Sequence, residues 1–164
     1  PTNGIVKFDG IPLSTLSEDR CTELRRKDIV LIFQSFELIQ SLTVYENIEY
    51  PLRLLKLPKN LRHQIITSVM KDLGMDGFSF RFPRELSGGQ QQRVGICRAL
   101  AVSPRLLVGD EITANLDSEN ANRVYEILKQ RQKQEGMTVI TVSHDETLTK
   151  YADKVVTMRD GRIV

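Results

Sequence analysis

The sequence has 164 residues, 40% of them hydrophobic and 27% charged, which is an ordinary composition for a globular domain. This length allows one domain, or one domain with a subdomain. The net charge of +2 is too small to imply a nucleic-acid partner, and the two cysteines, Cys21 and Cys97, have neither metal-binding nor redox spacing. No apolar run approaches the roughly 20 residues that span a bilayer, so we expect any membrane role to depend on a partner.

The N-terminal part of the sequence predicts two strands with a helix between them. Residues 5–8 (Ile-Val-Lys-Phe) come directly before the turn pair Asp9-Gly10, so we expect a short strand there. Ser17 and the two acids after it start a helix, and residues 25–27 place positive charge at its end, where the helix dipole favours it. The β-branched run over 29–33 predicts a buried strand of the parallel type.

Residues 35–100 differ in character, because helical patterns dominate them and no further strand is indicated. We expect a helix over 44–55 that Pro51 interrupts or kinks, and a second helix over 61–73. A third helix is expected from about residue 88 to about residue 102.

Strand patterns return after residue 100. Residues 106–108 predict a strand, and Ser118 starts a helix that Gly136 ends. Residues 137–142 predict another buried strand, and a hairpin is expected around Asp160-Gly161.

The order of these elements predicts an α/β fold with a mostly parallel sheet. We expect residues 1–34 and 101–164 to form the α/β core. Residues 35–100 are expected to form an inserted helical subdomain.

One stretch of the sequence predicts an anion site at the start of a helix. Ser87, Gly88, Gly89 and Gln90 open a strongly helical segment, so bare N–H groups lie at the positive end of the helix dipole. A phosphate suits such a site best. The alternative is an ordinary cap, because Ser is a favoured N-cap residue. Two consecutive glycines weigh against it, since each costs about 1 kcal/mol of helix stability relative to Ala.

A pair of carboxylates predicts the chemistry that accompanies a triphosphate. Asp110 and Glu111 follow an apolar run, at the carboxyl end of a predicted strand, where open α/β sheets bind ligands. Asp110 is placed to hold Mg²⁺ through water, and Glu111 to orient or deprotonate an attacking water. The alternative is an ordinary strand followed by two exposed acids.

Two further polar residues follow predicted strands. His144, after Ser143, is placed to donate to a phosphate oxygen, and Gln34 to position water or contact the metal. A lone His is more often structural, and Gln34 by itself is uninformative. The other histidine, His63, lies on a polar helix face and is expected to be solvated. With the carboxylates, His144 and Gln34 predict a single nucleotide pocket.

Taken together, these residues resemble an ATP-binding subunit of the ABC transporter family, over essentially the whole chain. Leu86-Ser87-Gly88-Gly89-Gln90 matches the family signature, and the match continues through the Gln run that follows. The other matching positions are Gln34 for the Q-loop, Asp110 for Walker B, Glu111 for the catalytic glutamate, Asp117 for the D-loop and His144 for the switch histidine. The segment over 33–48 is similar to the branch of the lipoprotein-releasing and macrolide-exporting ATPases.

The resemblance implies a fold, a reaction and partners. The fold is a P-loop NTPase core with an inserted helical subdomain, and the reaction is hydrolysis of ATP with Mg²⁺, coupled to transport. Two such subunits, identical or different, close head to tail on ATP, and the signature and Asp117 of one face the nucleotide of the other. The pair drives transmembrane permease subunits from the cytoplasmic face of the cell membrane, without nucleic acid.

The sequence departs from the family pattern at several positions. Ile112 stands where Pro is usual, and Gly109 and Ala114 are uncommon choices. No Gly-Lys pair occurs, although a P-loop needs one to hold the β and γ phosphates. In the family that loop and its helix lie just upstream of a segment like residues 1–4. We therefore expect a fragment without the first strands and the P-loop helix, which binds MgATP weakly, is inactive alone and exposes an apolar sheet face.

Two other functions fit parts of this pattern. A degenerate, non-hydrolysing module would lend its signature to a partner subunit, which the missing P-loop favours and Glu111 and His144 oppose. A DNA-maintenance ABC ATPase would carry a very long coiled coil between Gln34 and Ser87. That interval is short here and contains no heptad run, so this alternative is the weaker one.

Overall fold

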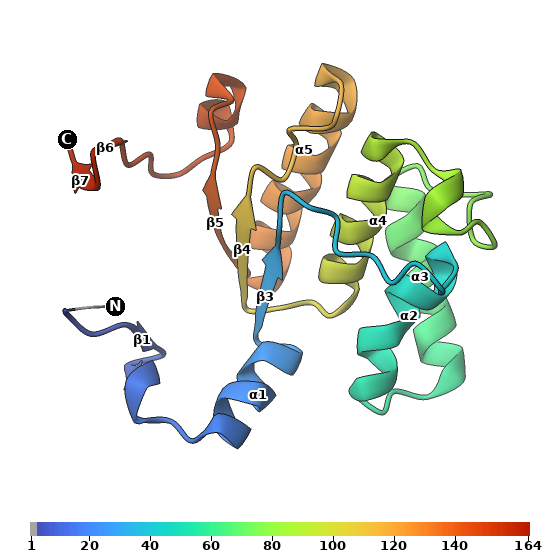
Figure 1. The fold of residues 1–164 in the computed structure, drawn as a ribbon, viewed down its shortest axis with the longest axis horizontal. Helices are drawn as coiled ribbons and strands as arrows, with labels where there is room; N and C mark the ends of the chain where they lie inside the picture. The colour runs from blue at the N-terminus through green and yellow to red at the C-terminus, as the bar shows by residue number, and fades with distance from the viewer. Residues whose placement is uncertain (1–2) are drawn as a thin grey trace.

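The computed structural model describes residues 3–164, apart from the side chain of Glu146, and a three-stranded parallel sheet lies at its centre (Figure 1). The strands, in spatial order, are β3 (Ile29–Ile32), β4 (Leu106–Asp110) and β5 (Thr138–Val142). The register pairs Ile32 with Gly109, and Asp110 with Val142. The carboxyl ends of all three strands therefore lie at the same edge of the sheet.

Three helices lie between β3 and β4 in the sequence and beside the sheet in space (Figure 1). They are α2 (Val44–Leu54), α3 (Lys59–Asp72) and α4 (Gly88–Ala101). One hydrophobic core joins them to the sheet, since Ile32 and Leu107 belong to the same buried cluster as Ile66 of α3. The predicted α/β fold class is confirmed, while the division at residues 34 and 100 stays a prediction. Within residues 3–164, no helix combines the length and the apolar character that a membrane span requires.

Helix α2 continues through Pro51, so an interruption there is wrong, while the predicted alternative of a kink stays a prediction. Proline cannot donate the hydrogen bond of its own turn, which normally weakens a helix interior. Here packing holds the helix, because Ile48 and Leu52 are fully buried. The buried Asn47 adds a side-chain bond, its Oδ1 accepting from the N–H of Ile39 at 2.9 Å.

The helix starts follow the predicted capping residues. Helix α1 (Glu18–Lys27) begins after Ser17, whose side chain accepts from the N–H of Arg20. Helix α5 (Ser118–Glu135) begins where expected, and its cap is Asp117. It ends at Gly136, which has a φ of 69°, a left-handed conformation that glycine adopts without steric cost.

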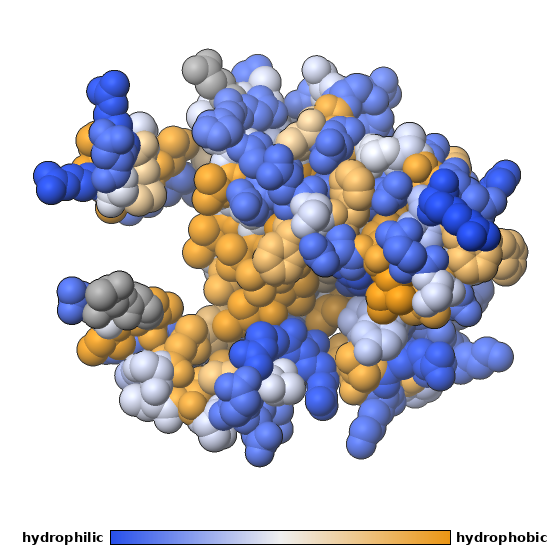
Figure 2. Space-filling model, in the orientation of Figure 1, coloured by the Kyte–Doolittle hydropathy of each residue, from blue (hydrophilic) through white to orange (hydrophobic). Residues whose placement is uncertain are grey.

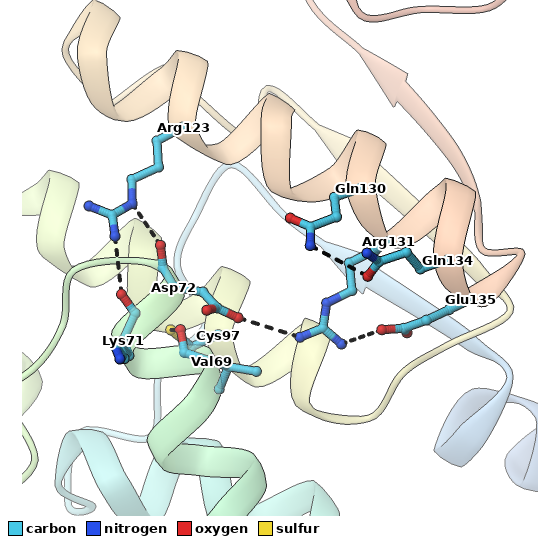
Figure 3. A network of polar contacts seen from close by, with 9 residues as sticks. All are labelled: Val69, Lys71, Asp72, Cys97, Arg123, Gln130, Arg131, Gln134 and Glu135. Atoms are coloured by element: carbon cyan, nitrogen blue, oxygen red, sulfur yellow. Dashed lines mark hydrogen bonds and ion pairs between the residues drawn. The ribbon is translucent and has the colours of Figure 1, made fainter.

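Helix α5 is joined to the C-terminal end of α3 by two arginines (Figure 3). Arg123 donates through Nε to the carbonyl of Asp72 at 2.6 Å, and a second nitrogen reaches the carbonyl of Lys71 at 3.1 Å. Arg131 lies between the carboxylates of Asp72 and Glu135, at 3.7 and 2.7 Å. Positive charge therefore meets the negative end of the α3 dipole, which stabilises the contact between the two helices.

One apolar face of the sheet is exposed, so the expectation of an exposed apolar sheet face is confirmed and the prediction of buried strands is wrong for β3 and β5. Leu31, Val108 and Ile140 form one row across the three strands. Leu31 is 46% exposed and Ile140 is 54% exposed. Figure 2 shows this hydrophobic surface between the N-terminal and C-terminal segments. The apolar runs carry the same kinds of residues on both faces, so the sequence alone did not tell the covered face from the open one.

Two short hairpins lie near the ends of the described chain. They are β1 (Lys7–Phe8) with β2 (Ile11–Pro12), and β6 (Met158–Arg159) with β7 (Arg162–Ile163). The predicted turn at Asp160-Gly161 is confirmed, with positive φ at both residues. The strand expected over 5–8 is shorter than predicted. Three 3₁₀ turns complete the elements: η1 (Leu13–Thr15), η2 (Pro83–Glu85) and η3 (Glu146–Lys150). Pro1 and Thr2, part of the segment expected to follow a P-loop helix, lie outside the described residues.

Candidate functional site

Glu111 and His144 meet at the carboxyl edge of the sheet. The Glu111 Oε1 accepts from the backbone N–H of His144 at 3.1 Å, and the His144 Nε2 lies 3.6 Å from the same oxygen. Glu111 has a φ of 50°, and its own N–H donates to the carbonyl of Val142 at 3.0 Å. Its side chain is 17% exposed, whereas that of His144 is 97% exposed. A held carboxylate beside a free imidazole can share a proton or a water between them.

Asp110 and Gln34 lie at the same edge of the sheet. Asp110 is the last residue of β4, Gln34 follows the end of the neighbouring strand β3, and both are exposed. Their oxygens are of the kind that Mg²⁺ prefers, and Mg²⁺ needs only one or two protein ligands when phosphate and water supply the others. In the part of the chain that the structure describes, no three His, Cys, Asp or Glu side chains form a metal-binding group. Asp110 and Gln34 each offer an oxygen atom at this edge of the sheet, and their assignment as Mg²⁺ ligands stays a prediction.

The signature stretch forms a capping box at the start of α4. The Ser87 Oγ accepts from the N–H of Gln90 at 3.3 Å, and the Gln90 Oε1 accepts from the N–H of Ser87 at 2.9 Å. The capping role that the sequence left open is thus present. Ser87 and Gly88 are nevertheless exposed, so the start of this helix remains open to a ligand from outside the chain.

The two signature glycines have different surroundings. A Cβ on Gly89 would lie 2.8 Å from the carbonyl oxygen of Asn115, which leaves no room for a side chain. A Cβ on Gly88 would make only an ordinary contact, 3.6 Å from the Phe36 ring. Packing inside the chain therefore explains why position 89 is a glycine, but it does not explain why position 88 is one.

Helix α4 also holds the segments that follow Gln34 and Glu111. The buried Gln92 donates through Nε2 to the carbonyl of Ile112 at 2.9 Å. Arg98 donates to the carbonyl of Glu37 at 2.7 Å, and burial lowers the pKa of its guanidinium. Sequence reasoning assigned neither residue a role, although the unusual Gln run after the glycines could have pointed to Gln92.

Asp117 is engaged within its own chain. Its Oδ1 accepts from the backbone N–H of Asn120 at 2.8 Å, and the Asn120 side chain donates to both carboxylate oxygens. The hydrogen bond from the Asn120 backbone holds the pKa of this carboxyl below its usual range. Asp117 therefore stays ionised at the N-terminus of α5, beside the loop that packs on Gly89.

His63 lies on α3 and is exposed, as predicted, and its ring also contacts a neighbouring side chain. Its Nδ1 lies 3.2 Å from the hydroxyl of Tyr45, and the two rings are tilted neighbours. Both residues line a surface groove of about 330 Å³ together with Met70 and Phe80. This groove is lined by α2, by α3 and by the loop over 76–80, and Glu111 is not among its lining residues.

The sequence is similar to known transporter ATPases. The model of the ABC transporter family matches residues 1–114. The chain is 43% identical over its full length to MJ1508 of Methanocaldococcus jannaschii, an uncharacterised ABC transporter ATP-binding protein, and covers 73% of it. Over 98% of its length it is 36% identical to YtrE of Bacillus subtilis, an ABC transporter ATP-binding protein, of which it covers 70%. It is 40% identical to the methionine import ATP-binding protein MetN of Corynebacterium jeikeium, but spans only 45% of that protein.

The fold is similar to solved structures as well. A dimeric structure of MJ0796, a bacterial ABC transporter cassette, matches with a TM-score of 0.92 at 35% identity. The match covers 99% of this chain and 72% of that one. A post-hydrolysis state of the same cassette, bound to ADP and phosphate, matches with a TM-score of 0.91.

Proposed function

Because the chain belongs to the ABC transporter family of ATP-binding proteins, we propose that it is an ATP-binding and ATP-hydrolysing subunit that energises a membrane transporter. The observation that carries the proposal is the contact of Glu111 with His144 at the carboxyl edge of the sheet. A general base needs a fixed position near the attacking water, and the bond from the His144 backbone gives Glu111 that position. The ADP- and phosphate-bound state of the similar MJ0796 cassette supports hydrolysis.

Each residue at this edge has a distinct role in the proposal. Glu111 orients the attacking water and accepts its proton, and the exposed His144 imidazole donates to a phosphate oxygen. Asp110 holds Mg²⁺, with Gln34 as a further ligand or a water-positioning group. The metal, when bound, neutralises charge that develops on the phosphates.

The exposed start of α4 serves a second subunit in the proposal. Gly88 and Gly89 present their N–H groups, and Ser87 and Gln90 their side chains, to the ATP held by that subunit, at the positive end of the helix dipole. The glycine at position 88 supports this role. A side chain there would fit within the chain, but it would obstruct a ligand lying close to the backbone. Asp117 is placed at the same surface in the proposal, and the dimeric structure of the similar MJ0796 cassette supports pairing of two subunits. We propose that the pair is head to tail, with subunits identical or different in sequence.

We propose that ATP hydrolysis drives transmembrane permease subunits. Binding to these subunits places the protein at the cytoplasmic face of the cell membrane. Similarity over 33–48 favours export or extraction, whereas the methionine importers among the relatives supply import as the competing direction. A DNA-acting ATPase is disfavoured, because the interval between Gln34 and Ser87 holds the compact helices α2 and α3 in place of a long coiled coil.

A non-hydrolysing partner module is the second candidate. One observation favours it: the 164 residues contain no Gly-Lys pair, so they include no lysine-bearing phosphate loop. For the same reason we expect these 164 residues alone to bind MgATP weakly and not to hydrolyse it. Micromolar affinity in an equilibrium titration would contradict that expectation.

The test compares Glu111→Gln with the matched control Glu119→Gln in the protein as the cell produces it. Loss of the base in Glu111→Gln should lower ATP turnover by at least about 100-fold, with ATP affinity within about two-fold of the parent. Glu119→Gln, in the first turn of α5, should retain full turnover. Equal turnover in Glu111→Gln and the parent would overturn the assignment of Glu111. A parent that does not hydrolyse ATP but activates a partner ATPase through Ser87 would favour the second candidate.

A further inference from the structure

A buried tyrosine touches both of the loops that follow Glu111 and His144. Tyr125 lies on α5 with 1% of its surface exposed. Its hydroxyl is 2.5 Å from the Oγ1 of Thr113 and 3.3 Å from the Oδ2 of Asp145. Thr113 follows Glu111 by two residues, and Asp145 directly follows His144.

The direction of these hydrogen bonds is fixed by the charge of Asp145. Its Oδ1 accepts from the hydroxyl of Thr147 at 2.6 Å and from the Thr147 N–H at 2.9 Å, and these bonds hold the pKa of the carboxyl below its usual range. Ionised Asp145 can only accept, so Tyr125 donates to it and accepts in turn from Thr113. Burial raises the pKa of the Tyr125 hydroxyl, which keeps its proton in place.

We propose that Tyr125 is a positioning residue, whose hydroxyl sets the spacing between the loop of Glu111 and the loop of His144. The His144 imidazole is 97% exposed and restrains its own loop little. The His144 N–H must nevertheless stay within 3.1 Å of Glu111, and the Thr113–Tyr125–Asp145 chain connects the two loops from the buried side. The inference rests on the proposed function, since it concerns the same pair of groups.

Another tyrosine provides a matched control. The ring of Tyr151 lies 5.3 Å from that of Tyr125, so the two share one aromatic contact. The hydroxyl of Tyr151 donates to the Asn122 side chain at 3.3 Å and, unlike that of Tyr125, has no bond to Thr113 or Asp145. Tyr151→Phe therefore removes a hydroxyl from the same cluster without cutting the connection between the loops.

The first experiment needs no nucleotide. The amide proton of His144 is bonded to a carboxylate, and NMR reports that bond as a downfield shift and slowed solvent exchange. In Tyr125→Phe we expect solvent exchange of the His144 amide proton to accelerate about five-fold or more. This factor corresponds to the free energy of one buried hydrogen bond. Tyr151→Phe should stay within about two-fold of the parent, and Glu111→Gln should abolish the downfield shift. Parent-like exchange and shift of His144 in Tyr125→Phe would overturn the proposal.

Two further measurements separate positioning from general destabilisation. If Tyr125→Phe does not fold, Thr113→Val removes the hydroxyl that bonds to Tyr125 and should accelerate exchange of the His144 amide proton in the same way. An unchanged His144 amide signal in Thr113→Val would overturn the proposal. In the protein as the cell produces it, Tyr125→Phe should lower kcat about ten-fold with KM within about two-fold, whereas an unchanged kcat counts against the inference. If the parent shows no turnover but the NMR change occurs, the proposed function fails and the positioning role stands.

Discussion

The side chain of Ile112 fills the space next to Gly109 at the end of β4. A Cβ placed on Gly109 would overlap the Cγ2 of Ile112, whose side chain is only 1% exposed. Both residues are departures from the family pattern that the resemblance implies, with Pro expected in place of Ile112. The two departures from the family pattern therefore compensate each other, because the missing side chain at Gly109 makes room for the larger Ile112.

We predict that Gly109→Ala destabilises the protein by about 1–3 kcal/mol, the usual cost of overpacking a core. Ile112→Ala alone should cost about 2–5 kcal/mol through the cavity it leaves. In the double variant the overlap is gone, so the total loss should be smaller than the sum by at least about 1 kcal/mol. Urea unfolding of the four proteins measures this coupling, and strictly additive losses would show that the two residues do not share the space.

A second prediction separates the two signature glycines. Gly89→Ala should lower the free energy of unfolding by about 1–3 kcal/mol, because the new methyl group meets the carbonyl of Asn115. Gly88→Ala is the matched control and should range from neutral to about 1 kcal/mol more stable, since its methyl group makes only ordinary contact with Phe36 and Ala favours a helix over Gly. Thermal unfolding decides between them. Equal stability of the two variants would mean that the loop at Asn115 moves aside freely.

The arginine contacts between α5 and α3 give a third prediction. Arg123→Ala should destabilise the protein by about 1 kcal/mol, because the carbonyls of Lys71 and Asp72 lose a charged donor. Arg20→Ala serves as the control, since Arg20 makes an exposed ion pair with Glu23 that we expect to contribute less than about 0.5 kcal/mol. Denaturant unfolding measures both. A loss for Arg123→Ala no larger than for the control would indicate that solvent replaces the bonds at the end of α3.

A fourth prediction concerns acid stability and Asp117. Its pKa is lowered in the folded chain, so its stabilising effect is present above the unfolded pKa of about 3.9 and is lost as the pH falls through the lower folded pKa. Asn also caps helices well, so Asp117→Asn should be close to the parent at pH 7. Below about pH 4 its stability should fall less steeply than that of the parent. Parallel stability curves from pH 7 to pH 2 would refute the assigned role of this carboxylate.

The local features of the fold followed from the sequence. Helix starts at Ser17 and Ser87, the stop at Gly136 and the turn at Asp160-Gly161 each depend on a few neighbouring residues, whose preferences act within one turn of chain. Pro51 is the exception, because its helix is held by the burial of its own residues Ile48 and Leu52 in the core shared with other elements.

The residues of the candidate site were also visible in the sequence, as polar groups placed directly after strands. Asp110, Glu111 and His144 lie at one sheet edge because parallel strands end together. Their individual roles stay proposals. The burial of the sheet did not follow in the same way, because Leu31 and Ile140 have the same apolar character as the residues of the covered face.

By itself, the sequence determined the α/β class, the order of elements and the identity of the polar groups at the strand ends, since these depend on periodicity and on neighbouring residues. The tertiary structure alone decided which sheet face is covered, why Gly89 lacks a side chain, and that Tyr125 connects the loops of Glu111 and His144. Those features arise between residues far apart in the chain, where only the packing of α4 and α5 against other segments sets the distances.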